Sequence, residues 1–253
     1  MTTEGHLSAR DVFLSFRRHN RVIEVLKSVS VEIMPQQIVV LLGPSGCGKS
    51  SLLNILAGFF TQDKGTVLLD EEPISGPGPE RGVVFQNHSL FPWKTILGNV
   101  EFPLRMKGVD TTKRREIANR IIGEVGLSGF EQAYPSELSG GMAQRVGIAR
   151  MLASDPKVML MDEPFGSLDA QTRVKMRELF AVVWNQYKKS VLFVTHDIDE
   201  ALLLGDRIFV MSARPATIID ELRITLPRPR SDKDLFTPEA ITLRERLYGL
   251  LRK

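Results

Sequence analysis

A glycine-rich loop that carries one lysine and two serines follows a short apolar stretch near the start of the chain. It fills the pattern G-x-x-x-x-G-K-[ST] with Gly43, Pro44, Ser45, Gly46, Cys47, Gly48, Lys49 and Ser50. Glycines allow successive backbone N–H groups to turn inward, which makes a nest for phosphate oxygens at the N-terminus of a helix. Lys49 adds a positive charge for β- and γ-phosphates, and the Ser50 hydroxyl can ligate Mg²⁺. The loop predicts a site for a phosphate chain and a metal ion.

Two adjacent carboxylates, Asp162 and Glu163, end a second apolar run in the sequence VMLMDEP. A carboxylate at the end of a buried strand can organise Mg²⁺ through its water shell, which is the role predicted for Asp162. Glu163 can act on an attacking water, either as general base or as the group that positions it. In isolation such a pair is also typical of a solvated strand end, and the phosphate loop favours the catalytic interpretation.

The patterns around these residues predict a mostly parallel sheet covered by helices. Unbroken apolar runs of strand length, typical of strands buried on both faces, lie at 38–42, 158–161 and 191–194. At 29–33 apolar and polar residues alternate, which predicts a half-buried, antiparallel strand. Helical spacing predicts a helix through 117–125 that stops at Gly126, and another through 176–187 that begins after Asp169.

The stretch from about 87 to 156 has helical patterns and no convincing buried strand, so we expect a helical subdomain inserted into an α/β core. With 253 residues the chain is close to the upper size of one hydrophobic core. We predict a single domain over 1–253, with its core at about 1–86 and 157–225, the helical subdomain between them, and a tail at about 226–253.

The composition is typical of a soluble globular protein. Charged residues make up 25% and hydrophobic residues 43%, and no apolar run reaches the roughly 18 to 20 residues that cross a bilayer. The N-terminal sequence MTTEGHLSAR lacks the layout of a secretory signal, and the one cysteine, Cys47, excludes an internal disulfide. These features predict a cytoplasmic protein. A net charge of +3 with scattered basic residues argues against a dedicated nucleic-acid groove.

Six motifs in sequence order resemble those of the ATP-binding-cassette (ABC) ATPases. They are the phosphate loop at 43–50, Gln86 in VVFQN, LSGGMAQR at 138–145, MDEP at 161–164, Ser167-Leu168-Asp169, and His196 in FVTHD. LSGGMAQR is similar to the family's signature motif, and the others are similar to its Walker A loop, Q-loop, Walker B strand, D-loop and switch. The resemblance runs through nearly the whole chain. It implies a P-loop NTPase fold with antiparallel N-terminal strands, a RecA-like core and an inserted helical subdomain.

The resemblance also implies a role for each matching residue. The catalytic residues would be Lys49, Gln86, Glu163 and His196, and the metal ligands Ser50, Gln86 and Asp162. Nucleotide contacts would come from Phe16, residues 43–51, Gln86, Ser139, Gly140, Gly141, Gln144, Asp162 and His196. The signature residues would start a helix near Met142, where exposed N–H groups suit an anion. ATP and Mg²⁺ are the implied ligands.

Some of these positions carry alternatives or departures. Phe16 in VFLSF stands where the family places an aromatic ring that stacks on adenine, but Phe13 is close and either residue could simply belong to the core. Ser51 replaces the family's usual threonine and keeps the hydroxyl, and Ala143 replaces a more common polar residue. Cys47 is expected to contribute its backbone N–H and no thiol chemistry. None of these departures removes a catalytic group.

The resemblance makes the functional unit a pair of chains. Two subunits, identical or related, would pack head to tail, so that each γ-phosphate lies between Lys49 of one chain and residues 139–141 of the other. ATP binding would close this dimer and hydrolysis would open it. The segment 88–100, with the aromatic residues Phe91 and Trp93, would dock a membrane permease, although both rings could instead pack inward.

Shorter phrases narrow the resemblance to the nitrate, sulfonate and taurine importer branch. They are GPGPERGVVFQ at 76–86, LFPW at 90–93 and LPRPR at 226–230. The implied protein is the ATPase subunit of an importer, peripheral on the cytoplasmic face of the plasma or inner membrane, working with permease subunits and an extracytoplasmic solute-binding protein. Its cargo would be a small anion, or a pyrimidine-like vitamin precursor as in some relatives. The alternatives are an ABC-type ATPase that acts on nucleic acid or ribosomes, and a P-loop kinase or GTPase, which the signature motif argues against.

Overall fold

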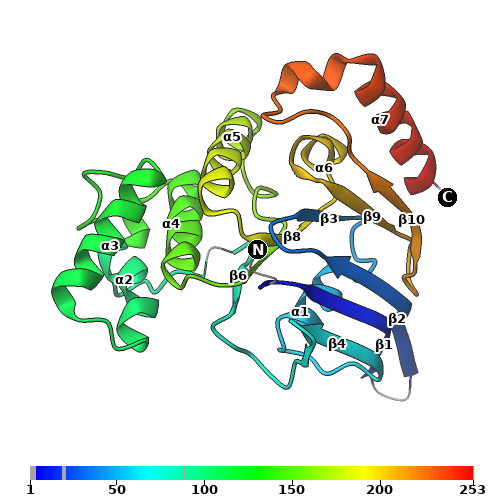
Figure 1. Cartoon of the computed structure of the whole chain (residues 1–253), viewed down its shortest axis with the longest axis horizontal. Helices are drawn as coiled ribbons and strands as arrows, with labels where there is room; N and C mark the ends of the chain where they lie inside the picture. The colour runs from blue at the N-terminus through cyan, green and yellow to red at the C-terminus, as the bar shows by residue number, and fades with distance from the viewer. Residues whose placement is uncertain (1–3, 19–20, 88, 253) are drawn as a thin grey trace.

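The computed structural model describes residues 4–18, 21–87 and 89–252, and this part of the chain forms two β-sheets flanked by helices (Figure 1). The larger sheet has the order β10-β9-β3-β8-β7-β6, with β9 through β6 parallel and the edge strand β10 antiparallel. Its strands are β3 (Ile38–Leu42), β6 (Arg81–Val84), β7 (Val158–Asp162), β8 (Ser190–Thr195), β9 (Arg207–Met211) and β10 (Ile218–Arg223). The predicted mostly parallel sheet is confirmed.

Strand β3 explains why the predicted strands are apolar at every position. Ile38, Val40 and Leu42 belong to the hydrophobic core on one face of the sheet, and Val39 and Leu41 belong to the core on the other face. All five side chains are fully buried, as expected for a strand that is covered on both faces. A strand in this position must end in a loop at the sheet edge, and for β3 that loop is the glycine-rich one.

The smaller sheet is antiparallel and has the order β2-β1-β4-β5. Its strands are β1 (Leu7–Arg18), β2 (Arg21–Ile33), β4 (Lys64–Leu69) and β5 (Glu72–Pro73). In β2 the side chains of Val29, Val31 and Ile33 are buried and Ser30 between them is exposed, which confirms the predicted alternation. Together with helix α1 (Lys49–Leu56), this sheet shares a core with one face of the larger sheet.

Helices α5 (Ala170–Tyr187), α6 (Ile198–Leu204) and α7 (Pro238–Leu251) cover the other face (Figure 1). Helix α5 begins after Asp169, as predicted, because the Asp169 carboxylate accepts a hydrogen bond from the Thr172 N–H at 3.0 Å. The C-terminal segment packs over α6, where Arg244 of α7 pairs with Asp199 at 2.7 Å. A short 3₁₀ turn, η2 (Asp232–Phe236), connects this segment to the sheet side of the molecule.

A group of helices stands beside the sheet edge formed by β6 (Figure 1). This helical arm contains α2 (Ile96–Met106), α3 (Thr111–Glu124), the 3₁₀ turn η1 (Pro135–Glu137) and α4 (Gly140–Ala153). Gly126 has φ +69°, the left-handed conformation that ends a helix, as predicted for the end of α3. The described residues between 89 and 156 contain no strand, in agreement with the expected helical insertion. The exact domain boundaries stay a prediction.

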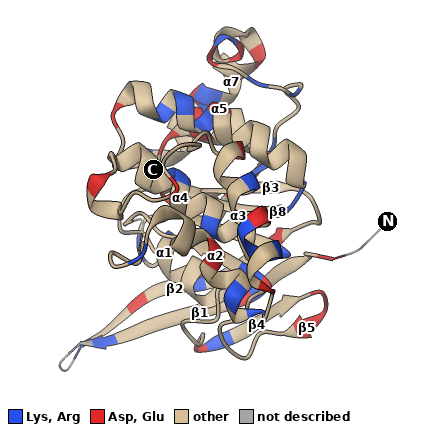
Figure 2. Cartoon of the chain, turned by 90° about the vertical axis from the view of Figure 1, so that its left-hand side faces the viewer, with Lys and Arg blue, Asp and Glu red and all other residues tan. Residues whose placement is uncertain are grey.

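Along the ribbon in Figure 2, positions of positively and negatively charged residues are interspersed. The structure thus keeps in space the scattered arrangement found in the sequence. Among the described residues, no helix combines the length and the apolar character that a membrane span requires.

Three fully buried aromatic rings join α5 to the parallel sheet. The ring of Phe180 lies 6.4 Å from Phe165 and 6.0 Å from Phe193, measured between ring centroids. These rings fix the position of the helix that follows Ser167–Asp169. Because a buried phenyl ring is lost and a cavity is left, Phe180→Ala should lower the free energy of unfolding by about 3–5 kcal/mol, measured by denaturant titration.

Val182 offers a matched control on the same helix, since 67% of its side chain is exposed. Val182→Ala should change the free energy of unfolding by no more than about 0.5 kcal/mol. Equal losses in the two variants would show that the aromatic cluster does not hold α5.

Candidate functional site

The glycine-rich loop connects β3 to α1 in the conformation that phosphate binding requires. Gly46 has φ +74° and Gly48, the N-cap of α1, has φ +133°. A Cβ atom on Gly48 would also come within 3.0 Å of Val25 and Leu26 of β2. These positions therefore need glycine, both for backbone conformation and for space. Ser45, Gly46 and Ser50 are exposed, and Ser51 is half-buried on α1.

Lys49 begins helix α1 and is 3% exposed, and its ammonium lies over the loop. Its Nζ donates hydrogen bonds to the carbonyl oxygens of Gly43 at 2.9 Å and Pro44 at 3.0 Å, and it lies 3.7 Å from Glu163 Oε1. A buried cation with one carboxylate neighbour leaves a positive field at the N-terminus of α1. The Cys47 thiol is buried, and the Cys47 N–H donates to the Pro44 carbonyl at 3.3 Å, inside the loop.

Ser50 and Asp162 meet in front of the loop. The Ser50 hydroxyl donates to Asp162 Oδ1 at 3.0 Å. Burial is the largest influence on Asp162 and raises the pKa of its carboxyl, against the opposing effects of the Ser50 hydrogen bond and the Lys49 charge. A partly buried carboxylate that gains from a nearby cation suits a divalent metal.

The donor set around Ser50 and Asp162 fits Mg²⁺. In the described part of the chain, no group of three or more His, Cys, Asp or Glu side chains forms a metal cluster. Mg²⁺ commonly uses one or two carboxylates together with phosphates and waters, so one hydroxyl and one carboxylate beside a phosphate loop match its needs.

Glu163 and His196 form a hydrogen-bonded pair at the same edge of the sheet. His196 Nδ1 lies 3.1 Å from Glu163 Oε2, with the imidazole half exposed. Glu163 has φ +44°, a left-handed conformation uncommon for this residue type, and its N–H donates to the Val194 carbonyl at 3.0 Å. The strained turn after β7 thus aims the Glu163 carboxylate toward the end of β8.

Gln86 reaches the same place from the end of β6. A Cβ atom placed on Gly166 would lie 3.5 Å from Gln86 Nε2 and 3.5 Å from Glu163 Oε2, so these two polar groups flank Gly166. The structure therefore brings together Lys49, Ser50, Gln86, Asp162, Glu163 and His196, which come from the ends of four parallel strands.

The signature residues are placed elsewhere. Ser139 is the N-cap of α4 and accepts a hydrogen bond from the Met142 N–H at 3.3 Å, so the helix begins at Gly140, two residues before the predicted start. Ser139 and Gly140 are exposed, and Gln144 is buried within α4. Within this chain the glycines face the D-loop and α5, since a Cβ on Gly141 would lie 2.6 Å from Thr172 Cγ2. Despite this contact, Ser139 and Gly140 at the N-terminus of α4 remain exposed.

Phe16 lies on β1 and is 41% exposed, so it is not a core residue. Its ring makes an edge-on contact with Phe60 at 5.8 Å between centroids. Phe13 is half-buried below the Lys64 ammonium. Of the two candidates for an adenine-stacking ring, Phe16 is the one that offers an exposed face.

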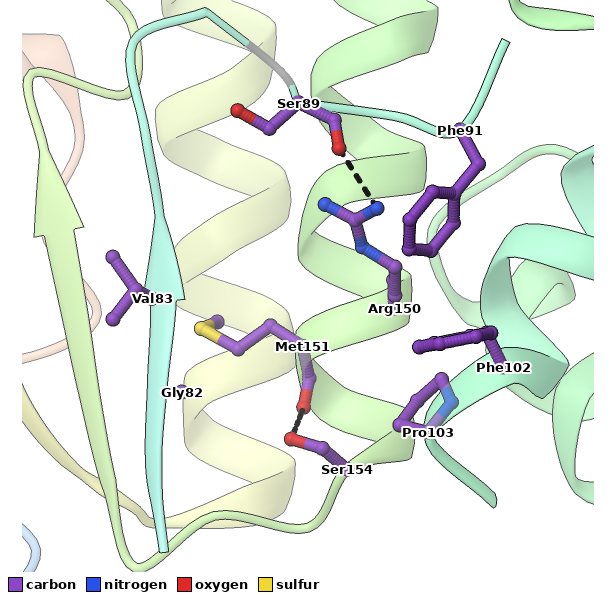
Figure 3. A pocket seen from close by; sticks show the side chains of 9 residues that line it. All are labelled: Gly82, Val83, Ser89, Phe91, Phe102, Pro103, Arg150, Met151 and Ser154. Atoms are coloured by element: carbon purple, nitrogen blue, oxygen red, sulfur yellow. Dashed lines mark hydrogen bonds between the residues drawn. The ribbon is translucent and has the colours of Figure 1, made fainter. Parts of the chain in front are cut away.

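A groove between β6 and the helical arm contains residues that sequence reasoning missed (Figure 3). It has a volume of about 300 Å³ and is lined by Gly82, Val83, Ser89, Phe91, Phe102, Pro103, Arg150, Met151 and Ser154. The Arg150 guanidinium stacks over the Phe91 ring at 5.3 Å and donates to the Ser89 carbonyl at 2.9 Å. Burial lowers the pKa of this guanidinium. Trp93, next to the groove, is 72% exposed.

Buried Asn99 of α2 holds the loop that carries these rings. Its Oδ1 accepts from the Phe91 N–H at 2.9 Å, and its Nδ2 donates to the carbonyls of Phe91, Lys94 and Thr95 at 3.2, 3.1 and 3.0 Å. Because no individual helix is predicted around residue 99, nothing in the sequence marks this asparagine as buried. The predicted docking segment spans 88–100. The structure describes it from residue 89 onward, and His88 lies outside the described residues.

The parallel sheet, the phosphate loop and the carboxylate pair at its end define a P-loop NTPase. A family model described as ABC transporter matches residues 26–166. An uncharacterized ABC transporter ATP-binding protein of Methanocaldococcus jannaschii is 46% identical over 94% of this chain and 88% of its own length. The taurine import ATP-binding protein TauB of Yersinia pestis is 45% identical over 88% and 90% of the two chains. The chain belongs to the ABC transporter family.

One further relative and two solved structures extend this result. The nitrate import ATP-binding protein NrtD of Synechocystis is 43% identical over 98% of this chain and 95% of its own length. The dimeric structure of a bacterial ABC transporter cassette has a TM-score of 0.78 at 32% identity and covers 87% of this chain and all of that one. A post-hydrolysis state of the same cassette, bound to ADP and Pi, has a TM-score of 0.77 at 31% identity, with the same coverage of both chains. The protein is an ABC-type ATPase.

Removing the Lys49 ammonium should disable the phosphate loop. We expect Lys49→Ala to lower ATP affinity or turnover at least about 100-fold, because the charge that faces the β- and γ-phosphates is lost. Nucleotide titration and phosphate release measure the two effects. Lys175→Ala, at an exposed position on α5, is the matched control and should leave both unchanged. Wild-type kinetics in Lys49→Ala would contradict the assignment of the loop.

Proposed function

We propose that two copies of this chain trap ATP between them and use its hydrolysis to energise the uptake of a small anion through separate membrane subunits. The observation that carries the proposal is the exposed N-terminus of α4, which is capped by Ser139. Helix α4 has 14 residues, and its N-terminus offers N–H groups and a partial positive charge to an anion. A second chain can supply that anion as the γ-phosphate of its own ATP.

The hydrolytic step follows from the Glu163 and His196 pair. Glu163 Oε2 accepts a hydrogen bond from His196 Nδ1, so the imidazole holds the carboxylate in one orientation. The other oxygen, Oε1, lies toward Lys49, where the γ-phosphate would be bound. Glu163 is therefore placed to orient a water for attack and to accept its proton. Gln86 Nε2 and Glu163 Oε2 both lie 3.5 Å from the Cβ position of Gly166, so Gln86 is placed to contact the same water.

Bound Mg²⁺ would be held by Ser50 and Asp162 and would neutralise charge on the phosphates. The residues of this chain do the remaining work. The N–H groups at the start of α1 and the Lys49 ammonium bind and orient the phosphate chain, and closure of the second subunit excludes bulk water. When the γ-phosphate leaves, the contact that joins the subunits is lost and the dimer opens.

The groove lined by Phe91 and Arg150 is the proposed docking site for the membrane subunits. It adjoins Gln86 in sequence, so one loop links the water-contacting glutamine to the docking surface. An apolar pocket with a half-buried cation and an exposed Trp93 beside it suits an amphipathic helix with an acidic or carbonyl end. We place the protein on the cytoplasmic side of the membrane as a peripheral subunit.

Relatives named for taurine and nitrate import support a small anion as the cargo, delivered by an extracytoplasmic solute-binding protein. A clamp for nucleic acid or ribosomes is less well supported, since such relatives carry long coiled-coil insertions. Here the longest helices of the arm, α3 and α4, have 14 residues each.

The dimer can be tested by blocking hydrolysis. Glu163→Gln keeps the size of the side chain and its contact with His196 but cannot accept a proton. With Mg²⁺ and ATP it should hydrolyse at least about 100-fold more slowly and accumulate as a dimer, measured by phosphate release and by light scattering after size exclusion. The double variant Glu163→Gln with Lys49→Ala should remain monomeric. A single variant that stays monomeric with ATP bound would overturn the proposal.

The docking groove makes a separate prediction. Phe91→Ala combined with Trp93→Ala should reduce co-purification with the membrane subunits, and with it cargo uptake, because aromatic anchors often contribute 2 kcal/mol or more to an interface, about 30-fold in affinity. ATP binding by the isolated chain should not change. Met106→Ala is the control, since Met106 is 62% exposed on α2 but does not line the groove. Normal uptake by the double variant would exclude this surface.

A further inference from the structure

Two helices of the site begin in the same way, directly after a functional loop. Helix α5 follows the D-loop and is capped by Asp169, and helix α6 follows His196 and is capped by Asp197. Asp197 Oδ1 accepts hydrogen bonds from the N–H groups of Asp199 at 2.8 Å and Glu200 at 3.1 Å. Its second carboxylate oxygen, Oδ2, takes no part in the cap and faces α5.

Arg173, in the first turn of α5, connects these two helix starts. Its Nη2 donates to the carbonyl of Leu168, in the D-loop, at 2.9 Å, and its Nη1 lies 3.7 Å from Asp197 Oδ2. A cation in the first turn of a helix is opposed by the helix dipole, so stabilising α5 does not explain an arginine at this position. Arg173 is explained by its contacts outside α5, which are with the D-loop and with Asp197, the residue after His196.

Hydrogen bonds join the residues on either side of His196 to one another. The Thr195 hydroxyl accepts from the Asp197 N–H at 3.0 Å and donates to Glu200 Oε2 at 2.6 Å. Glu200 is 3% exposed, and burial raises the pKa of its carboxyl. These hydrogen bonds tie Thr195, Asp197 and Glu200 together on either side of His196, so a shift of the Asp197 carboxylate would act on the residue that precedes it.

The other end of the link leads to the signature motif. Leu168 Cδ2 lies 3.8 Å from the Cβ position of Gly140, at the start of α4. The D-loop is thus in contact with the helix that would receive the partner's γ-phosphate, and Arg173 holds the carbonyl of the same leucine.

We propose that Arg173 is a positioning residue that couples the D-loop to His196 through Asp197. The inference rests on the proposed function, because it assigns Arg173 a part in ATP hydrolysis by the closed dimer. Seating of a partner's phosphate at the start of α4 shifts Leu168, Arg173 carries the shift to Asp197, and from there it reaches the imidazole of His196, which is already paired with Glu163. The ion pair at 3.7 Å is longer than a hydrogen bond, which leaves room for it to shorten.

The test is a double-mutant cycle on the full-length chain. Arg173→Gln removes the charge, and Asp197→Asn removes its partner while keeping an oxygen that can cap α6. Each single variant should lose at least about tenfold in kcat with unchanged ATP affinity, since the loop around Lys49 is untouched. The double variant should be no slower than the slower single variant, because both changes break one link.

Arg177→Gln is the matched control. Arg177 lies one turn further along α5 and pairs with Asp232 of the C-terminal segment at 3.0 Å, and its charge, like that of Arg173, lowers the pKa of Glu200 against the larger effect of burial. This variant should keep its kcat even if it lowers the melting temperature. Arg173→Lys should recover part of the lost rate, because an ammonium keeps the charge but cannot fork between a carbonyl and a carboxylate.

The outcomes separate the two levels of the proposal. A wild-type chain that hydrolyses ATP, together with an Arg173→Gln variant of normal kcat or with additive losses in the cycle, overturns the role of Arg173 and leaves the proposed function intact. A wild-type chain without ATPase activity overturns the proposed function itself. If Arg173→Gln does not fold, Arg173→Lys and Asp197→Asn decide the question on the same terms.

Discussion

The site depends on the interaction of the Lys49 ammonium with the oxygen atoms around it. Its ammonium is buried at the base of α1, where two loop carbonyls and the Glu163 carboxylate are its neighbours. A lysine in this position is stable because these oxygens compensate for lost hydration, yet its neighbours do not form a tight pair with it. The Lys49 ammonium can therefore exchange weak internal contacts for those of an anion, and Glu163 Oε1 lies 3.7 Å from it.

The parallel sheet brings the remaining groups to this charge. Strands buried on both faces leave their polar residues only at the ends, and the carboxyl ends of parallel strands lie at one edge. Asp162, Glu163 and His196 reach that edge from β7 and β8, and Gln86 reaches it from β6. The helical arm stands beside this arrangement, and Ser139 and Gly140 at the start of α4 are exposed.

The sequence was sufficient for those features that depend on local pattern. The loop, the buried strands, the helix after Asp169 and the stop at Gly126 follow from residue types and spacing, and the structure confirms them. Asn99, Arg150 and Arg173 could not be predicted, since each acts on residues brought near it only by folding. Arg173 looks like any surface arginine on a helix until the D-loop and the switch are placed on either side of it. The roles of Phe16 and of the signature stay predictions.

The hydrogen bonds of Asn99 have a consequence for recognition. One buried amide satisfies four backbone groups of the loop that carries Phe91, so a surface segment without regular structure is fixed from below. A rigid aromatic surface loses little conformational entropy when a partner arrives, and more of the contact energy is then available for affinity. The same four hydrogen bonds join the loop to α2, so a partner seated on Phe91 would also bear on that helix.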